Sequence, residues 1–314
     1  MHFRTEIRIP KPPFQIGYSD QLMSIGSCFS EHIGNYFKEA HFTTSINPFG
    51  QQYNPASVSN AIARLLTGQL YTEDDLVFYE ELYHSFDHHG SYSRPDKAAA
   101  LALINSELEQ QAAALRRCTV LFLTFGTSHV FRRKDTGIIV SNCHKIPGSQ
   151  FDFELIKPDV IVALLFQQLT ALRAMNPNIK LVFTVSPVRY FAFGHYENSV
   201  SKAHLFTSIH ELLALIDNSY YFPAYELVMD ELRDYRFFAE DMLHPNYQAT
   251  RFVWEKVVDT FFSKETRQVL MQVEHVVQAA KHRPRNPNSE AHRQFLERTD
   301  LLRRQLNTKW GIQF

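Results

Sequence analysis

Two short segments of the chain carry side chains of the kinds that nucleophilic catalysis needs. In the first, Gly26-Ser27-Cys28, an apolar run over residues 22–25 meets a glycine, and a helical pattern follows over 30–40. A hydroxyl or thiol on such a turn stands at a helix N-terminus, where free N–H groups and partial positive charge lower a thiol pKa or stabilise an oxyanion. Taken alone, the pattern also fits an ordinary turn that contains a packed cysteine.

The second segment is an Asp/His pair, Asp241 and His244, followed by Pro245 and Asn246. An Asp three residues before a His, just ahead of a helix, puts both side chains on one loop. The carboxylate can then orient the imidazole, fix its tautomer and stabilise its protonated form. An exposed loop with a helix cap would look the same. The two segments together, at opposite ends of one α/β unit, predict a nucleophile with an Asp/His pair.

The elements between these segments predict an α/β fold. Apolar runs typical of buried strands cover 22–25, 119–125 and 181–185, and a shorter one covers 220–222. Helical patterns alternate with them over 30–40, 56–67, 97–117, 158–175, 198–215 and 246–262. This order favours a doubly wound parallel sheet sandwiched by helices. Sites in such sheets lie beyond the carboxyl ends of the strands, where most of the chemistry-bearing segments fall.

The last fifty residues differ in character and predict a separate unit. Residues 264–314 carry ten Lys or Arg against five Asp or Glu, and two helices are expected at about 265–281 and 290–306. We therefore predict a catalytic domain over 1–263 and a basic helical extension over 264–314. A solvated basic face explains this charge better than nucleic-acid binding.

Composition narrows the possible partners and cofactors. The chain has 314 residues, 45% hydrophobic and 21% charged, with a formal net charge of −1, so no overall field recruits nucleic acid or an anionic membrane. Three irregularly spaced cysteines exclude a disulfide framework and a paired zinc motif. No glycine-rich phosphate loop follows a strand, and we expect no cofactor. The charged N-terminus and the lack of a long apolar run predict a cytoplasmic protein.

Several segments in this order resemble the GSCFA-domain family, within the clan of SGNH, or GDSL-type, hydrolases. The resemblance spans residues 20–262 and includes the family's naming motif at 26–30, with Ser30 in place of the final alanine. Its other segments are Asn47-Pro48-Phe49-Gly50, Gly126-Thr127-Ser128-His129, Ser141-Asn142-Cys143-His144, residues 184–188, and Asp241 with His244-Pro245-Asn246.

The resemblance implies roles for individual residues. In register with the Gly-Asp-Ser turn of the clan, Cys28 stands where the nucleophilic serine is found, and Ser27 stands where the aspartate is found. Cys28 is therefore favoured over Ser27 as nucleophile, and Ser27 is expected to hydrogen-bond within the turn. Ser128 replaces the usual oxyanion-hole asparagine. Either the Ser128 hydroxyl or the Asn142 amide would serve as a donor, with Gly50 as the glycine donor.

The remaining histidines suggest substrate binding rather than metal binding. His129 and His144 fall close to the proposed active edge. His84 and His88 have the spacing HxxxH, which with Asp87 and His144 would suit a metal, but that spacing places two ligands on one face only in a helix. Residues 83–95 read as a loop, so no metal site is predicted. Cys143, Arg189 and Tyr190 are expected to line the pocket or contact substrate.

The function that these observations favour is hydrolysis or transfer of an acyl ester through a covalent acyl-enzyme. By family resemblance, the substrate would be a small-molecule ester or an O-acylated carbohydrate. A non-catalytic ligand-binding module that kept the fold is the alternative, because positions 27, 28 and 128 depart from the pattern of the clan.

Overall fold

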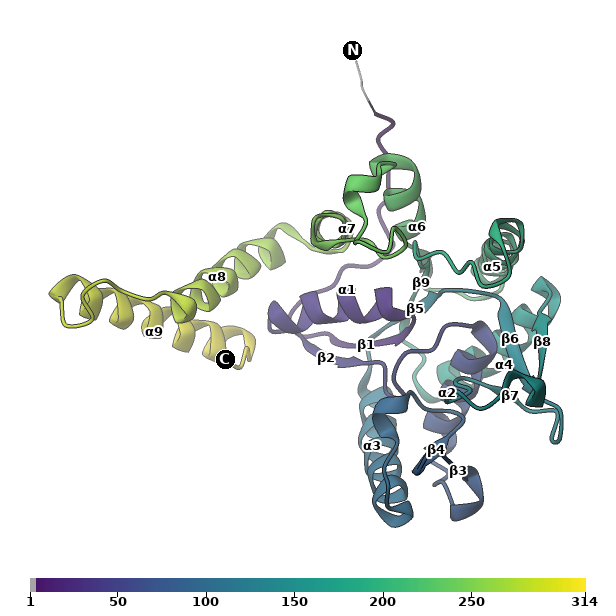
Figure 1. Cartoon of the computed structure of the whole chain (residues 1–314). Helices are drawn as coiled ribbons and strands as arrows, with labels where there is room; N and C mark the ends of the chain where they lie inside the picture. The colour runs from purple at the N-terminus through teal and green to yellow at the C-terminus, as the bar shows by residue number, and fades with distance from the viewer. Residues whose placement is uncertain (1–3) are drawn as a thin grey trace.

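The computed structural model describes residues 4–314, and its centre is a five-stranded parallel sheet with helices on both faces (Figure 1). The strand order is β10-β9-β5-β1-β2, and every neighbouring pair is parallel. The strands are β1 (Gln21–Gly26), β2 (Thr43–Ile46), β5 (Val120–Phe125), β9 (Lys180–Val185) and β10 (Ser219–Tyr221). The predicted α/β fold with a parallel sheet between helices is confirmed.

The central strands alternate between two apolar cores because successive side chains point to opposite faces of a sheet. Leu121 and Leu123 face one core, whereas Val120 and Phe122 face the other. The first core is covered by α2 (Pro55–Thr67), α3 (Lys97–Arg117), α4 (Pro158–Met175) and α5 (His195–Leu215). The second is covered by α1 (Cys28–Glu39), α6 (Ala224–Glu226), the π-helix Leu227–Leu232 and α7 (Tyr247–Phe261). Burial on both faces explains why the strands read as unbroken apolar runs.

Two small antiparallel sheets were not predicted. One is the hairpin of β3 (Leu76–Tyr79) and β4 (Leu82–Ser85), and the other joins β6 (His129–Arg133), β7 (Ile139–Val140) and β8 (Phe151–Leu155). The expectation of a loop over 83–95 is therefore wrong at its start, where Leu82–Ser85 pairs with Leu76–Tyr79. These strands are only two to five residues long, and cross-strand side-chain pairs stabilise such short strands.

The direction of chain progression through the sheet reverses between β1 and β5. From β1 the sheet continues to β2 on one side and to β5, β9 and β10 on the other. In open parallel sheets the carboxyl ends of the two strands at such a switch point flank a crevice in which ligands bind. The turn Gly26-Ser27-Cys28 leaves β1 at this point, so the fold puts the first chemistry-bearing segment at the crevice.

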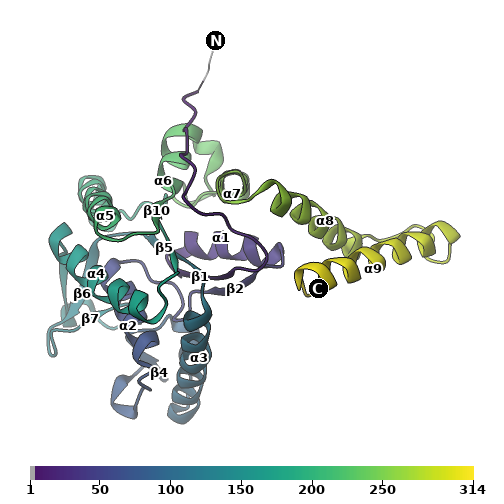
Figure 2. The ribbon, with the colours of Figure 1, turned by 180° about the vertical axis from the view of Figure 1, so that it is seen from behind.

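The last two helices form a long antiparallel hairpin that extends away from the sheet (Figures 1 and 2). We call α8 (Lys264–Lys281) and α9 (Glu290–Trp310) the arm. Val269, Val273 and Val276 of α8 belong to the second core, and α9 buries Leu306. At the chain end, His41 Nδ1 donates to the Gln313 carbonyl at 2.6 Å. The arm therefore contacts the α/β part at α8 and again at the C-terminus.

No helix within residues 4–314 combines the length and apolar character needed to cross a bilayer.

Candidate active site

The turn between β1 and α1 is held by close backbone contacts. Gly26 has φ 154°, and a Cβ there would collide with the Thr124 carbonyl of β5, so only glycine fits. The Gly26 N–H donates to Asn47 Oδ1 at 2.9 Å, and the Ser27 N–H donates to the Thr124 carbonyl at 3.1 Å. Ser27 is the N-cap of α1 and Cys28 its first residue. These contacts fix Cys28 at a helix N-terminus beyond the end of β1.

The two adjacent nucleophile candidates have different environments. Ser27 is only 1% exposed, and its hydroxyl has no hydrogen-bond partner among residues 4–314. The prediction that Ser27 hydrogen-bonds within the turn is therefore wrong for its side chain, which lies pressed against Gly126. Cys28 is half-buried, and its thiol stands at the start of the helix. Of the two side chains, the thiol is the more accessible.

Burial raises the pKa of the Cys28 thiol above its usual value. The backbone N–H groups of Phe29 and Cys28 lower that pKa, the Glu31 carboxylate raises it, and the charge of Lys202 lowers it. The first turn of the helix thus presents donors to the sulfur, as expected of a helix N-terminus. In the free protein, Cys28 is a thiol that needs a base or a further charge for full activation.

Asp241 and His244 form a closely bonded pair on the loop before α7. Asp241 Oδ2 lies 2.6 Å from His244 Nδ1, and Oδ1 accepts the N–H groups of Leu243 and His244, each at 2.9 Å. The N–H of His244 is the largest of the causes that lower the pKa of Asp241 to about 2. An ionised carboxylate holds the proton on Nδ1 and leaves Nε2 free to act as a base. Both side chains are nearly half exposed.

Cys28 and His244 line one pocket of about 570 Å³ at the carboxyl ends of β1, β5 and β9. Ser27 and Leu243 also contribute to its lining, and Asp241 stands behind His244. Within residues 4–314 no hydrogen bond joins Cys28 Sγ to the His244 imidazole. The structure therefore brings the two predicted segments to the same cavity without bonding them to each other.

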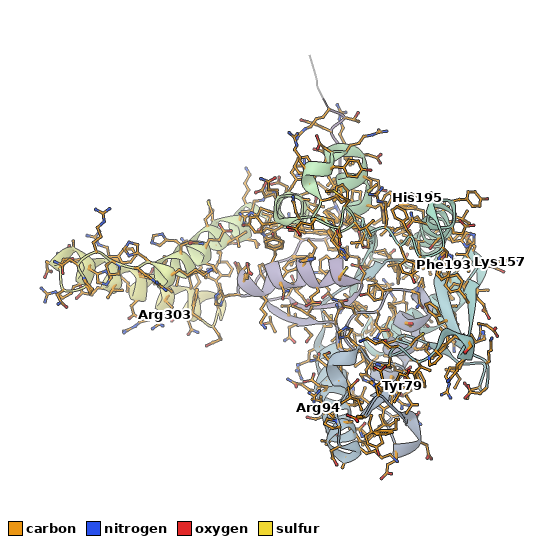
Figure 3. All side chains as sticks on the ribbon, viewed as in Figure 1. Tyr79, Arg94, Lys157, Phe193, His195 and Arg303 are labelled. Atoms are coloured by element: carbon orange, nitrogen blue, oxygen red, sulfur yellow. The ribbon has the colours of Figure 1, made fainter. Side chains whose placement is uncertain are left out.

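An aromatic stack supports one wall of the pocket. The His129 ring, which lines the pocket, packs against Phe153 of β8, with ring centroids 4.8 Å apart, and against Phe193, at 5.2 Å, and these two phenylalanine rings also stack on each other. Phe193, labelled in Figure 3, stands two residues before His195, where α5 begins. His129 Nδ1 is 3.1 Å from the Thr127 hydroxyl, and burial lowers the pKa of His129. A neutral, stacked His129 suits substrate contact better than proton transfer.

The three residues expected to form the oxyanion hole do not line the pocket. The Gly50 N–H donates to the Asn47 carbonyl at 2.7 Å, so it is not free. Ser128 is 0% exposed, and its hydroxyl donates to the Ser201 carbonyl at 3.1 Å. Asn142 uses its side-chain oxygen to accept the N–H of His144 at 2.9 Å. The chain turns into β6 directly after Ser128, which draws that side chain under α5 and away from Cys28.

His144 and the other clustered histidines serve the packing of the small sheets. His144 Nε2 bonds to the Ser85 carbonyl at 2.7 Å, its ring stacks on His84 at 4.4 Å, and burial lowers its pKa to about 4. His88 bonds to the Ser85 hydroxyl at 2.8 Å, and Asp87 accepts from the Tyr71 hydroxyl at 3.0 Å. Over the described range 4–314, no group of three or more His, Cys, Asp or Glu side chains is arranged to hold a metal ion.

Sequence reasoning missed a pocket-lining amide, Asn54. Its Oδ1 accepts the Ser57 N–H at 2.8 Å as the N-cap of α2. This bond orients the amide and leaves its NH₂ group on the other side, and Asn54 lines the pocket with Cys28. In the sequence, Asn54 followed by proline is typical of a helix start, so its place in the pocket could not be predicted from that pattern.

Lys202 of α5 was also missed. Its side chain is almost fully buried, and its Nζ bonds to the backbone carbonyls of Gly126, Ser186 and Val188, which line the pocket. A lysine on the face of α5 that also carries Leu205, Ile209 and Leu212 was the available signal, since lysine is rarely buried without a partner.

Comparisons with known proteins cover most of the chain. A model described as the GSCFA family matches residues 21–257, and one described as a GSCFA domain protein, C-terminal domain, matches residues 273–310. No curated protein matches. Several solved structures are similar, and three of them are described in turn. A mutant acetyl esterase with an acetate ion has TM-score 0.38 and 9% identity, over 82% of this chain and 99% of that one.

The second structure is a carbohydrate esterase family 3 protein from Talaromyces cellulolyticus, with TM-score 0.37 and 10% identity over 82% of this chain and 99% of that chain. The third is an acetyl xylan esterase from the rumen bacterium Butyrivibrio proteoclasticus, with TM-score 0.37 and 14% identity. That match covers 77% of this chain and 63% of the other. The two family models match different parts of this chain: one matches the α/β part and the other matches the arm.

Proposed function

This chain belongs to the GSCFA family, and from that premise we propose that it hydrolyses or transfers the acyl group of an ester through a thioester on Cys28. One observation carries the proposal. Cys28 at a helix N-terminus and His244, fixed by Asp241, line the same pocket at the switch point of the sheet. A thiol at a helix N-terminus, an imidazole and a carboxylate that orients it are the parts that acyl transfer requires.

The acylation step follows from these groups. His244 Nε2 takes the proton of the Cys28 thiol while the sulfur bonds to the ester carbonyl carbon, and the carbonyl electron pair moves onto oxygen. The tetrahedral intermediate then collapses, the bond to the alcohol oxygen breaks, and the imidazolium gives its proton to the departing alkoxide. An alcohol leaves and a thioester remains on Cys28. Asp241, ionised throughout, holds the Nδ1 proton and stabilises the imidazolium.

In deacylation, His244 first takes a proton from the attacking acceptor and then returns a proton to Cys28. Water, or another hydroxyl acceptor, gives a proton to His244 Nε2 as its oxygen bonds to the thioester carbon. The carbon–sulfur bond breaks, the acid or new ester leaves, and the thiolate recovers its proton from the imidazolium. Hydrolysis and transfer therefore use the same residues and differ only in the acceptor.

Two donors are available for the oxyanion in this proposal. The Cys28 N–H is at the first position of α1 and has no helical acceptor, and Asn54 offers its side-chain amide from the other side of the pocket. Donors fixed before reaction need no reorganisation as charge develops on oxygen. Gly50 and Ser128 have no part in this assignment because their donors bond elsewhere, and Asn142 has none because it does not line the pocket.

Catalysis also needs His244 to approach Cys28. Among residues 4–314 no hydrogen bond joins their side chains, and the His244 side chain is 45% exposed. Such bonds commonly shorten only when substrate fills the site. We expect a bound acyl group to displace solvent and bring Nε2 to the sulfur.

For substrate, we propose an ester of a small acyl group, with O-acylated carbohydrates as the first class to test. Tyr53 and Tyr190 line the pocket and are each about two-fifths exposed, which gives flat amphipathic faces for a sugar ring. We also propose a reducing, cytoplasmic compartment, because there Cys28 stays a free thiol.

A second candidate function, a ligand-binding module without catalysis, is favoured by one observation. Burial raises the pKa of Cys28. Within residues 4–314, no hydrogen bond to His244 activates the thiol in the free protein. Such a module would bind esters in the same pocket and leave them intact.

The two functions are separated by trapping the acyl-enzyme. The full chain is mixed with short-chain aryl esters and acetylated sugars, quenched in acid and analysed by mass spectrometry of intact protein and peptides. Acyl transfer predicts an adduct on the peptide with Cys28, absent in Cys28→Ala and much reduced in His244→Ala. Cys143→Ala is the matched control, because this half-buried cysteine lies outside the pocket lining. Ester binding with no adduct and no turnover supports the binding module.

A further inference from the structure

Within residues 4–314, a buried lysine, Lys202, lies beneath the proposed active site. Its side chain comes from α5, and the residue is 3% exposed. Nζ bonds to the carbonyls of Gly126 at 2.6 Å, Ser186 at 2.6 Å and Val188 at 2.9 Å. These residues follow β5 and β9, so one side chain joins two loops at the carboxyl end of the sheet. No carboxylate lies within ion-pair distance of it in the described chain.

The three acceptors indicate the charge state of Lys202. An ammonium group has three N–H donors and no acceptor, and here each donor meets a carbonyl oxygen. A neutral amine would turn a lone pair toward one of those oxygens. Burial lowers the pKa of Lys202 to about 7, and the charge of Cys28 raises it. The bonding geometry thus favours a buried cation whose charge is met by carbonyl dipoles and, when formed, by the Cys28 thiolate.

The cation stands directly behind the pocket wall. Gly126, Ser186 and Val188, whose carbonyls hold it, line the pocket together with Cys28. Because the wall excludes water, a charge there acts on the pocket with little screening. The effect is mutual, since the charge of Lys202 lowers the pKa of Cys28 while that of Cys28 raises the pKa of Lys202.

Other charged or titratable groups near the sulfur act differently. Glu31 of α1 raises the pKa of Cys28, and the Tyr53 hydroxyl is a second anionic neighbour when ionised. His244 lines the same pocket and is 45% exposed at its side chain. Arg189 also lines the pocket, but it donates to the Met242 carbonyl at 3.0 Å and lies over the rings of Phe191 and Phe238.

Among residues 4–314, no carboxylate forms an ion pair with Lys202 from its other side. Its ammonium lies 5.7 Å from the centre of the Tyr225 ring, which accepts positive charge on its face. In the described part of the chain, Cys28 is thus the ionisable group whose charge raises the pKa of Lys202.

We propose that Lys202 is a positioning residue of the active site, whose fixed buried ammonium favours the Cys28 thiolate and braces the loops after β5 and β9. The inference deepens the proposed function, because it assigns the charge that prepares its nucleophile. It also makes a claim that holds without any ester, namely that ionisation of Cys28 depends on Lys202.

The test is the pH profile of Cys28 alkylation by iodoacetamide, read from the Cys28 peptide by mass spectrometry. In Lys202→Gln we expect the midpoint to move up by about one pH unit and the rate at neutral pH to fall about tenfold, the change typical for loss of a nearby opposite charge. The measurement is repeated in His244→Ala, so that an imidazolium cannot mask the effect. Lys180→Gln is the matched control, since Lys180 also bonds a backbone carbonyl but at the opposite end of β9.

A loss of packing alone would lower the melting temperature of Lys202→Gln and leave the alkylation midpoint where it was. An unchanged midpoint in folded protein overturns the proposal. If Lys202→Gln does not fold, the proposal is tested by the effect of Cys28 on the titration of Lys202. The Lys202 side-chain NMR signal should then titrate at lower pH in Cys28→Ala than in the native chain, and equal titrations overturn the proposal.

Failure of the proposed function is recognised separately. If no ester acylates Cys28 but its alkylation depends on Lys202, the acyl-transfer assignment is wrong and the electrostatic link stands. If acyl-enzyme forms but the alkylation of Cys28 is the same with and without Lys202, the acyl-transfer assignment stands and the electrostatic role of Lys202 is wrong.

Discussion

Asp241 Oδ2 and His244 Nδ1 are 2.6 Å apart, and the carboxylate that makes this contact is itself held by two backbone N–H groups of the same loop. The hydrogen bonds that orient the imidazole toward the carboxylate all lie within four consecutive residues. The contribution of this pair can therefore be tested with little risk to stability.

Asp241→Asn should lower kcat of ester hydrolysis by about 10³- to 10⁴-fold, because an amide cannot stabilise the imidazolium and favours the wrong tautomer. The urea midpoint should stay close to that of the native chain, since both side chains are exposed. Steady-state kinetics with an aryl ester check the first claim and urea unfolding the second. Activity within tenfold of the native value would exclude a catalytic role for the pair.

Substitutions at 27 and 28 distinguish the adjacent nucleophile candidates. Cys28→Ala should abolish acyl-enzyme formation, and Cys28→Ser should keep a remnant, since a hydroxyl can still use His244 as base. Ser27→Ala should change the rate little, because the Ser27 hydroxyl is buried and has no partner among residues 4–314. Its stability should change by less than about 1 kcal/mol. An inactive Ser27→Ala beside an active Cys28→Ala would make this a serine enzyme.

The oxyanion role of Asn54 is tested by a variant that keeps its capping bond. Asn54→Ser retains an oxygen for the Ser57 N–H but removes the amide donor, so kcat should fall by about 10- to 10³-fold with little loss of stability. Asp96→Ser, at the N-cap of α3, is the matched control. Equal kcat values for native and Asn54→Ser would remove this residue from the oxyanion hole.

His88 makes folding stability depend on pH. His88 is 1% exposed and lies among aromatic rings. Burial lowers its pKa to about 3, whereas a histidine in the unfolded chain titrates near 6.5. The unfolded chain therefore takes up a proton first, so stability is full above about pH 6.5 and falls as the pH drops toward 3. Between pH 7 and 4.5, the native chain should lose about 2–3 kcal/mol more than His88→Gln. Urea unfolding at both pH values measures this, with exposed His210→Gln as control.

The arm should not be needed for chemistry. Its residues lie outside the pocket lining, so a chain that ends at residue 263 should keep measurable esterase activity per folded molecule. Its stability should fall by a few kcal/mol, about the value of burying Val269, Val273 and Val276 against the core. Circular dichroism and kinetics on the same sample check both claims. A truncated chain that folds but is inactive would show that the arm helps to build the site.

The large elements were predictable because they follow single-residue patterns. The helix over 97–117 matches α3 at both ends, and the apolar runs at 119–125 and 181–185 mark β5 and β9 to within a residue. Strands β6 and β8 were missed because their stability comes from pairing between His129–Arg133 and Phe151–Leu155, which no local window contains.

The site was predictable only where its residues share a short segment. Gly26 to Cys28 and Asp241 to His244 each form one turn, so their chemistry could be read locally. The contacts of Lys202 join carbonyls at 126, 186 and 188, and no spacing in the sequence connects these positions. Ser128 was misjudged because register with a strand end does not determine how the next loop turns.

The reacting groups and the walls of the pocket come from different parts of the architecture. Cys28 and the carbonyls that hold Lys202 belong to the ends of the parallel sheet, whereas Phe153 comes from β8 and Phe193 from the segment before α5. Substitutions in that stack can reshape the cavity without altering the register of the central strands. Substitutions in the pocket wall can therefore give the chain new preferences for the acyl group or the alcohol, while its reaction chemistry stays unchanged.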